Sequence, residues 1–140
     1  DTLVIITADH ETGGLALGRD GIYRWDPRPL RGVTATPAAM AAEFATGDAS
    51  LADIVADHSN LELSETERRR LEAISRSATA SLSMITRLFN ERTLTGWTTT
   101  GHTGVDVPLY VFGPGRARFR GVMQNEEVGR ILWETFLPDD

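Results

Sequence analysis

Residues 2–14 read TLVIITADHETGG, and this stretch decides the expected fold. Its first half, Thr2 to Ala8, is short, rich in β-branched residues and apolar on both alternating faces. That pattern is typical of a strand covered on both sides in an α/β sheet. The polar, glycine-rich residues that follow form a loop at the carboxyl end of the strand, where open α/β sheets bind ligands. The stretch therefore predicts a sheet core with a binding loop.

The composition of the chain narrows the class of protein. The 140 residues are 41% hydrophobic and 24% charged, which is ordinary for a globular protein with one core. A formal net charge of −6 argues against a nucleic-acid partner, because phosphate backbones are bound by Lys and Arg. The absence of cysteine excludes disulfides, thiolate zinc sites and cysteine nucleophiles. No apolar run approaches the roughly 20 residues of a membrane span.

The beginning of the chain indicates a piece of a longer protein. Asp1 leads directly into the apolar run, without Met. Since a natural N-terminus seldom begins inside a strand, we expect residues 1–140 to be a piece of a longer protein. A complete short domain is the alternative.

The middle of the chain, residues 37–92, reads as a helical insertion. Thr36 followed by Pro37 marks a helix start, and Gly47 marks its end. Ser50 can cap a second helix with the sequence LADIVADH. Neither helix carries an arrangement of side chains that predicts chemistry.

A long helix is predicted beyond these two. Ser64 and Glu67 form a capping box, and the helix is expected to run from there toward Asn90. Its apolar positions recur at spacings of three and four, which predicts one buried stripe. The stripe comprises Leu71, Ile74, Ala78, Leu82, Ile85 and Leu88.

The flanking segments are assigned to the sheet. We expect a hairpin over residues 15–25 that turns at Asp20-Gly21, and short strands over 33–36, 97–100 and 109–112. A final helix is capped by Gln124 or Asn125. The predicted fold class is α/β, part of a mostly parallel sheet flanked by helices. Residues 1–36 and 93–140 form the sheet core with its binding loops, and residues 37–92 form the insertion.

Asp9 and His10 are the first candidate metal ligands. A carboxylate oxygen and an imidazole nitrogen are the ligand types that zinc accepts without sulfur. The end of a strand holds both on a rigid scaffold while the loop leaves one side open. Taken alone, the pair is better explained as a carboxylate that caps the turn and a polar loop histidine.

His102 is the third candidate, and it lies in the segment Gly101-His102-Thr103-Gly104. Glycines nearby free the backbone to turn the side chain inward. An exposed hairpin histidine is the alternative. If the neighbouring strands share one sheet, the His10 and His102 loops emerge at the same edge. His58, the remaining histidine, follows a helix and reads as structural because an imidazolium favours a helix C-terminus.

Two segments together resemble one enzyme family. TLVIITADHETGG, residues 2–14, resembles the strand and metal loop of the alkaline phosphatase family. GWTTTGHTGVDVPLYVFGPG, residues 96–115, resembles the second metal loop and following strand of that family, in the same order. FRGVMQNEEVG, residues 119–129, resembles its closing stretch. The residues between the two loops resemble only the variable helical region of such enzymes.

The resemblance implies roles for the candidate ligands. In the full protein Asp9 and His10 would bind one zinc ion and His102 a second, beside a magnesium ion whose ligands lie upstream. The serine nucleophile and the other zinc ligands would also lie upstream. The chain then holds no catalytic residue and is expected to be inactive alone.

The resemblance also implies a substrate and a setting. The full enzyme would hydrolyse phosphate monoesters, release inorganic phosphate, form a homodimer and reside in the periplasm or outside the cell. Two alternatives stay open. One is a sulfatase or phosphodiesterase of the same superfamily, and the other is a non-catalytic metal-binding module.

Overall fold

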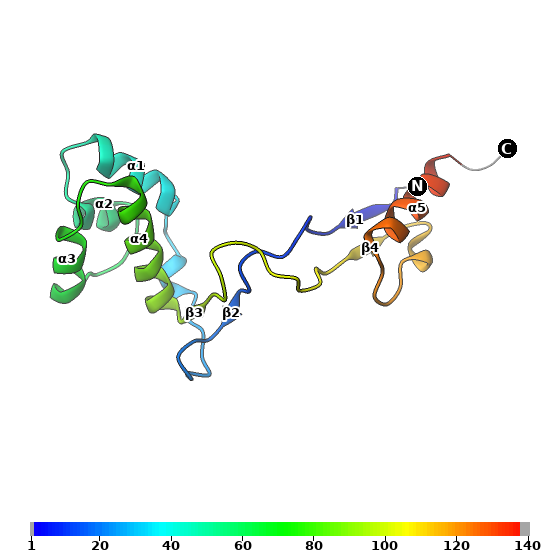
Figure 1. Cartoon of the computed structure of the whole chain (residues 1–140), viewed down its shortest axis with the longest axis horizontal. Helices are drawn as coiled ribbons and strands as arrows, with labels where there is room; N and C mark the ends of the chain where they lie inside the picture. The colour runs from blue at the N-terminus through cyan, green and yellow to red at the C-terminus, as the bar shows by residue number, and fades with distance from the viewer. Residues whose placement is uncertain (1, 138–140) are drawn as a thin grey trace. The chain divides into compact units, whose positions relative to one another are not determined.

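The computed structural model describes residues 2–137, which divide into two compact units. The first unit joins the two ends of the chain, residues 2–12 and 101–137. The second unit comprises residues 13–100. Figure 1 shows each unit with its own helices and strands, and the predicted insertion at 37–92 falls inside the second. Among the residues described, no helix combines the length and the apolar character needed to cross a bilayer.

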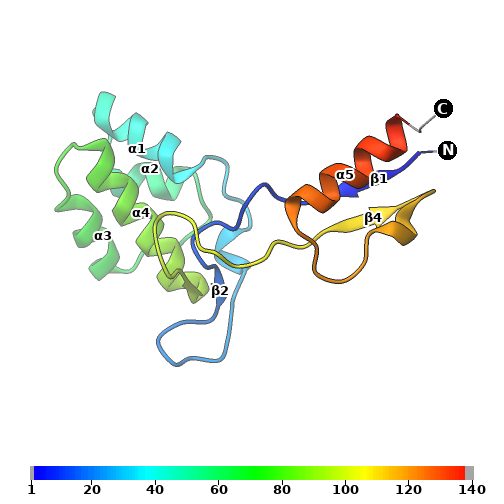
Figure 2. The same ribbon diagram turned by 45° about the vertical axis from the view of Figure 1, so that its right-hand side comes forward.

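The first unit is built on a two-stranded antiparallel sheet. β1 (Val4–Ile6) pairs with β4 (Tyr110–Phe112), so that Ile6 lies opposite Tyr110. A short 3-10 helix (Arg116–Arg118) and the helix α5 (Asn125–Phe136) follow β4, as Figure 2 shows. The predicted strand at 109–112 and the predicted cap at Gln124 are confirmed, the latter by a capping box with Glu127.

The sheet differs from the expectation in two ways. Within residues 2–137 both strand pairs are antiparallel, so a mostly parallel sheet is not confirmed there. β1 was expected to be covered on both faces, yet Val4 and Ile6 are exposed and only Ile5 is half-buried. Among the described residues only β4 pairs with β1, and Tyr110 and Phe112 of β4 are exposed as well.

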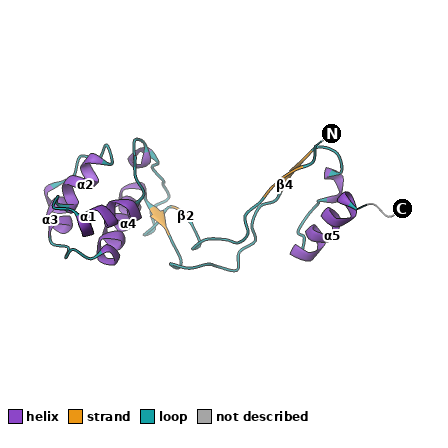
Figure 3. Ribbon diagram, turned by 90° about the horizontal axis from the view of Figure 1, so that it is seen from above, coloured by secondary structure: helices purple, strands orange, loops and turns teal. Residues whose placement is uncertain are grey.

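The second unit is a helical cluster with a short strand pair. β2 (Ala16–Leu17) pairs antiparallel with β3 (Thr95–Gly96). Figure 3 shows the helices gathered at one end of this unit. They are a 3-10 helix (Arg28–Leu30), α1 (Pro37–Thr46), α2 (Leu51–Asp57), α3 (Glu65–Glu72) and α4 (Ala78–Thr93).

The core of the second unit lies among these helices. Its members are aliphatic or aromatic side chains that recur at helical spacing, so each of the four α-helices buries one face. They are Met40, Ala41, Phe44, Leu51, Ala52, Ile54, Val55, Leu71, Ile85, Leu88 and Phe89.

The predicted helix starts are confirmed. The Thr36 hydroxyl accepts a hydrogen bond from the amide of Ala39 at 3.1 Å, with Pro37 in the first turn. Ser50 caps α2 in the same way, by accepting from the Asp53 amide at 3.1 Å. These hydroxyls satisfy amide groups that have no carbonyl partner inside the helix.

The prediction of one long helix from Ser64 is wrong, because the helix is broken into α3 and α4. The capping box at Ser64 is present, but α3 ends at Glu72 and Ser77 caps α4. Between them, the Arg76 guanidinium donates to the carbonyl of Phe44 in the last turn of α1 and to those of Gly47, Asp48 and Ala49 just beyond it. It thereby satisfies one carbonyl that the end of α1 leaves without an amide partner and three in the segment that follows.

Two smaller expectations about strands are corrected and one is confirmed. Residues 33–36 form no strand, since the Thr34 amide donates instead to the His58 carbonyl at 3.0 Å. The strand expected at 97–100 lies earlier, at Thr95–Gly96. The Asp20-Gly21 turn is confirmed, with both residues at positive φ as a type I′ turn requires.

The pairing of Glu67 with Arg92 makes the stability of the second unit depend on pH. The guanidinium of Arg92, hydrogen-bonded to Glu67 at 2.6 Å, lowers the pKa of that carboxyl from 4.5 to about 2. A carboxyl with a lowered folded-state pKa stabilises the fold above its unfolded pKa, and this contribution is lost as the pH falls toward 2.

We predict that Glu67→Gln lowers the free energy of unfolding at neutral pH by about 1 kcal/mol, a value reduced for partial solvent exposure. Glutamine keeps one acceptor oxygen for the capping box, so the change removes the charge and one of the two hydrogen bonds from Arg92. Urea unfolding at a series of pH values should show the variant and the wild type converging between about pH 4.5 and 2. Glu65→Gln, which removes a well-exposed partner of Arg69, is the control and should lower the free energy of unfolding by less. Parallel curves for Glu67→Gln and the wild type would contradict the prediction.

Candidate metal-binding site

Asp9 and His10 lie in the loop that leaves β1. The Asp9 carboxylate is oriented by its own loop, because Oδ1 accepts a hydrogen bond from the His10 amide at 3.0 Å. The other oxygen, Oδ2, lies 3.5 Å from His10 Nε2. One carboxylate oxygen and one imidazole nitrogen therefore lie close together.

The tautomer of His10 follows from its second ring contact. Nδ1 lies 2.9 Å from the main-chain oxygen of Glu11. A carbonyl oxygen only accepts hydrogen bonds, so Nδ1 carries the proton and, in the neutral ring, Nε2 keeps its lone pair. A carbonyl partner on the far ring nitrogen is the usual arrangement for a metal-binding histidine.

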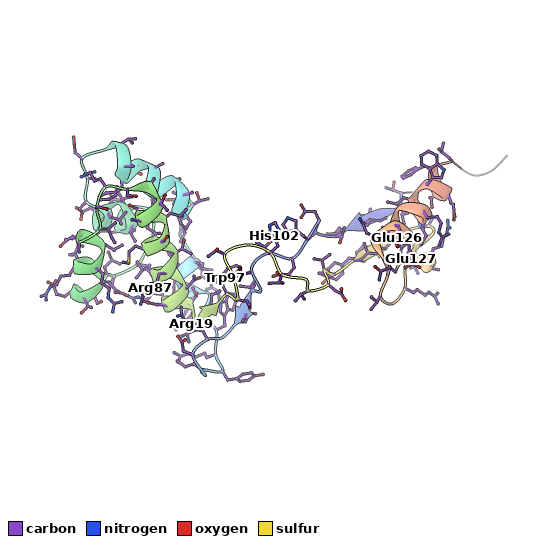
Figure 4. The ribbon with its side chains drawn as sticks, in the orientation of Figure 1. Arg19, Arg87, Trp97, His102, Glu126 and Glu127 are labelled. Atoms are coloured by element: carbon purple, nitrogen blue, oxygen red, sulfur yellow. The ribbon has the colours of Figure 1, made fainter. Side chains whose placement is uncertain are left out.

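His102 comes from the opposite end of the chain and meets His10. The two ring centroids are 3.7 Å apart, and the ring planes are inclined by 32°. Figure 4 shows His102 on the loop that leads into β4. Because β1 and β4 are antiparallel, the residues after β1 and those before β4 emerge at the same end of the sheet. The sequence expectation that both loops share one edge is confirmed.

A carboxylate that the sequence analysis did not single out links the two loops. Glu11 Oε2 accepts from the Thr103 amide at 3.1 Å and also from the Thr103 hydroxyl. Both residues are half-buried, and they are neighbours of His10 and His102 respectively. No pattern within either loop indicates this pairing. An acidic residue after Asp-His and a hydroxyl residue after Gly-His were the only signals.

The candidate ligands are open to solvent. The side chains of Asp9 and His10 are 86% and 44% exposed. Over residues 2–137, no three or more His, Cys, Asp or Glu side chains gather closely enough to hold a metal ion. The arrangement is thus a partial set of donors that needs further ligands to close a tetrahedral site.

His58 lies apart from this arrangement, in the second unit. Its Nε2 donates to the Glu43 carboxylate at 2.9 Å, and its Nδ1 is 3.0 Å from the Thr34 hydroxyl. It closes α2 as the C-cap residue. These contacts agree with the structural role expected from the sequence.

Gly13 continues the same sequence motif into the second unit. Its carbonyl accepts from the amides of Thr98 and Thr99 at 2.8 and 3.2 Å. Its φ of +73° lies in the left-handed region, and an added Cβ would stand 2.8 Å from the Trp97 ring. Only glycine meets both conditions without a shift.

Comparison with known proteins identifies the relatives of this chain. The alkaline phosphatase family model matches residues 1–136. Alkaline phosphatase 4 and alkaline phosphatase 3 of Bacillus subtilis are 38% and 40% identical to it. Each alignment covers 95% of the chain, but only 29% and 30% of the respective relatives. The chain therefore spans about three tenths of their length.

A solved structure resembles the fold closely. The cold-active alkaline phosphatase of a psychrophilic Shewanella sp. matches with a TM-score of 0.86 and 33% identity. The match covers 99% of this chain and 35% of that one. The likeness supports an α/β fold for the chain.

We predict that Gly13→Ala destabilises the second unit by about 3 kcal/mol, because left-handed strain adds to a clash with Trp97. Gly21→Ala is the matched control. Gly21 has nearly the same φ, +75°, but an added Cβ meets nothing within 4 Å. We therefore expect Gly21→Ala to lower the free energy of unfolding by only about 1 kcal/mol. Urea unfolding followed by circular dichroism measures both. Equal losses for the two variants would show that the contact with Trp97 contributes nothing.

Proposed function

This chain belongs to the alkaline phosphatase family, and on that premise we propose that it is the C-terminal portion of a metal-dependent phosphomonoester hydrolase. The juxtaposition of Asp9, His10 and His102 at one end of the sheet carries the proposal. The chain supplies these three residues to a two-zinc site. The serine nucleophile, the remaining zinc ligands and the magnesium ligands come from outside residues 1–140.

The spacing of donor atoms supports a shared zinc ion for Asp9 and His10. Zinc binds carboxylate oxygen and imidazole nitrogen at about 2.0 to 2.2 Å in tetrahedral sites, so two such donors lie about 3.4 Å apart. The observed separation of Asp9 Oδ2 and His10 Nε2 is 3.5 Å. Neutral His10, with its proton held on Nδ1 by the Glu11 carbonyl, offers Nε2 as the ligand atom.

His102 is assigned to the second zinc ion. The support is the resemblance of its segment to the second metal loop of the family, together with its position against the His10 ring, with the two ring centroids 3.7 Å apart. When bound, a pair of zinc ions offsets charge on the attacking and the leaving oxygen of an in-line displacement. The part of this chain is to orient three ligand atoms for that chemistry.

The remaining properties of the whole protein are part of the same proposal. Its substrates are phosphate monoesters, its product is inorganic phosphate, and it acts as a homodimer in the periplasm or outside the cell. Residues 1–36 and 93–140 contribute to the mostly parallel sheet of the complete domain. Residues 37–92 form an insertion.

Zinc titration of the chain tests the ligand assignment. Ring ¹⁵N resonances of His10 should move on addition of zinc sulfate, with Nε2 shifting as the ligand atom. Asp9→Asn should weaken the response by about tenfold or more, since the carboxylate is a direct ligand. His58, held between Glu43 and Thr34, is the internal control and should not respond. Equal responses of His10 and His58 would contradict the assignment.

Activity is a separate test. Incubated with a chromogenic phosphate ester, zinc and magnesium, the chain is expected to show no turnover above a metal-only blank. Turnover would contradict the claim that essential groups lie outside residues 1–140. Nanomolar affinity for two zinc ions, without turnover, would instead support a self-sufficient metal-binding module, because three ligands divided between two ions cannot bind that tightly.

A further inference from the structure

We propose that Glu11 is a positioning residue that ties the His102 loop to the His10 loop and so sets the spacing of the two candidate metal ligands. The inference rests on the proposed function for its chemical meaning. Its structural basis is the pair of hydrogen bonds that the Glu11 carboxylate accepts from Thr103.

The link between Glu11 and Thr103 lies where it can set the positions of both histidines. The paired backbone of the sheet ends at Ile6 and Tyr110, before either histidine is reached. Beyond that point, Glu11 and Thr103 join the two loops across 92 residues of sequence. Each is bonded directly to a histidine in the chain, so a shift of either one moves the corresponding ring.

Glu11 acts on both histidines through different atoms. Its carbonyl oxygen accepts from His10 Nδ1 and fixes the tautomer of that ring. Its carboxylate oxygen accepts from the amide and the hydroxyl of Thr103, which holds the start of the His102 loop. Glu11 thus orients the His10 ring and holds the backbone next to His102.

The chemistry of the contact suits a stable link. Hydrogen bonds to an ionised carboxylate are about twice as strong as neutral ones. Both donors belong to one residue, so they restrict the approach of Thr103 in direction as well as in distance. Half-burial of both partners shields the bonds from competing water.

The consequence concerns the distance between the metal ions. Two-metal hydrolase sites hold their ions about 3.5 to 4 Å apart, so ligands from separate loops must be kept in register. The ring centroids of His10 and His102 stand 3.7 Å apart, which measures how closely the two loops bring their rings together and is not a distance between ions. Without a side-chain oxygen at position 11 that accepts from Thr103, the loops keep their ligands but lose this register.

The test uses the 140-residue chain and nuclear Overhauser contacts between the His10 and His102 rings. The contact should be present in the wild type, lost in Glu11→Ala and retained in Glu11→Gln, whose side-chain oxygen still accepts from the Thr103 amide. Thr103→Val should weaken it and Thr103→Ser should restore it. Glu126→Gln removes an exposed charge from the same unit and should leave it unchanged.

A second contact keeps the result interpretable. The cross-strand contact between Ile5 and Val111 reports the sheet itself and should persist in Glu11→Ala. Loss of the ring contact while this one persists supports the positioning role. Retention of the ring contact in Glu11→Ala overturns it. If the sheet contact is also lost, the Thr103→Val and Thr103→Ser pair decides, since restoration by serine supports the link and equal behaviour overturns it.

Zinc sulfate then separates this inference from the proposed function. In Glu11→Ala the apparent dissociation constant read from the His102 ring shift should rise about tenfold, as for other residues that orient metal ligands. If wild-type histidines do not respond to zinc but Glu11→Ala loses the ring contact, the proposed metal role fails and the link stands. If zinc binds equally well to both proteins and the ring contact is unchanged, the link fails and the metal role stands.

Discussion

The antiparallel pairing of β1 with β4 is the constraint on which the candidate site depends. It sets the end of one strand beside the start of the other, with Ile6 opposite Tyr110. Asp9 and His10 follow the first strand, and His102 precedes the second. Closing a loop of about 90 residues to make such a pair costs roughly 4 kcal/mol in chain entropy, before any constant term.

The second unit removes much of this cost by folding as a compact body. Its own ends are joined, since the Gly13 carbonyl accepts from the Thr98 amide and Ala16 pairs with Gly96. The two ends of the second unit therefore lie beside each other. A helical insertion that closes on itself can stand in the sequence between the two loops of the candidate site without adding to the cost of bringing them together. The buried helices contribute to the site through this closure, although none carries a candidate ligand.

Local rules predicted much of the second unit. Thr36, Ser50 and Ser64 each cap the helix expected of them, because a capping hydroxyl acts within three residues of itself. The break between α3 and α4 escaped prediction because the apolar stripe continues across it with helical spacing. Arg76 lies in this break and donates hydrogen bonds to carbonyls near the end of α1. A contact between residues about thirty positions apart leaves no periodic trace in the sequence.

The same distinction applies to the site. Asp9, His10 and His102 could be named because their residue types and glycine context occur in recognisable segments. The sequence could not show whether the strands run parallel or antiparallel, since apolar runs of this length fit both kinds of pair. Glu11 was missed for a related reason. Its partner Thr103 becomes a neighbour only once the strand register is known.

The stability of this arrangement is tied to the exposed face of the sheet. A two-stranded ladder is marginal in water, and Val4, Ile6, Tyr110 and Phe112 remain largely exposed on it. Fully burying an exposed apolar side chain contributes about 1.5 to 3 kcal/mol, so covering these half-exposed side chains contributes roughly half of that each. A surface that buried this face would therefore stabilise the ladder and, through it, the register of the histidine loops. While that face is exposed, the hydrogen bonds from Thr103 to Glu11 contribute more to keeping the candidate ligands close together.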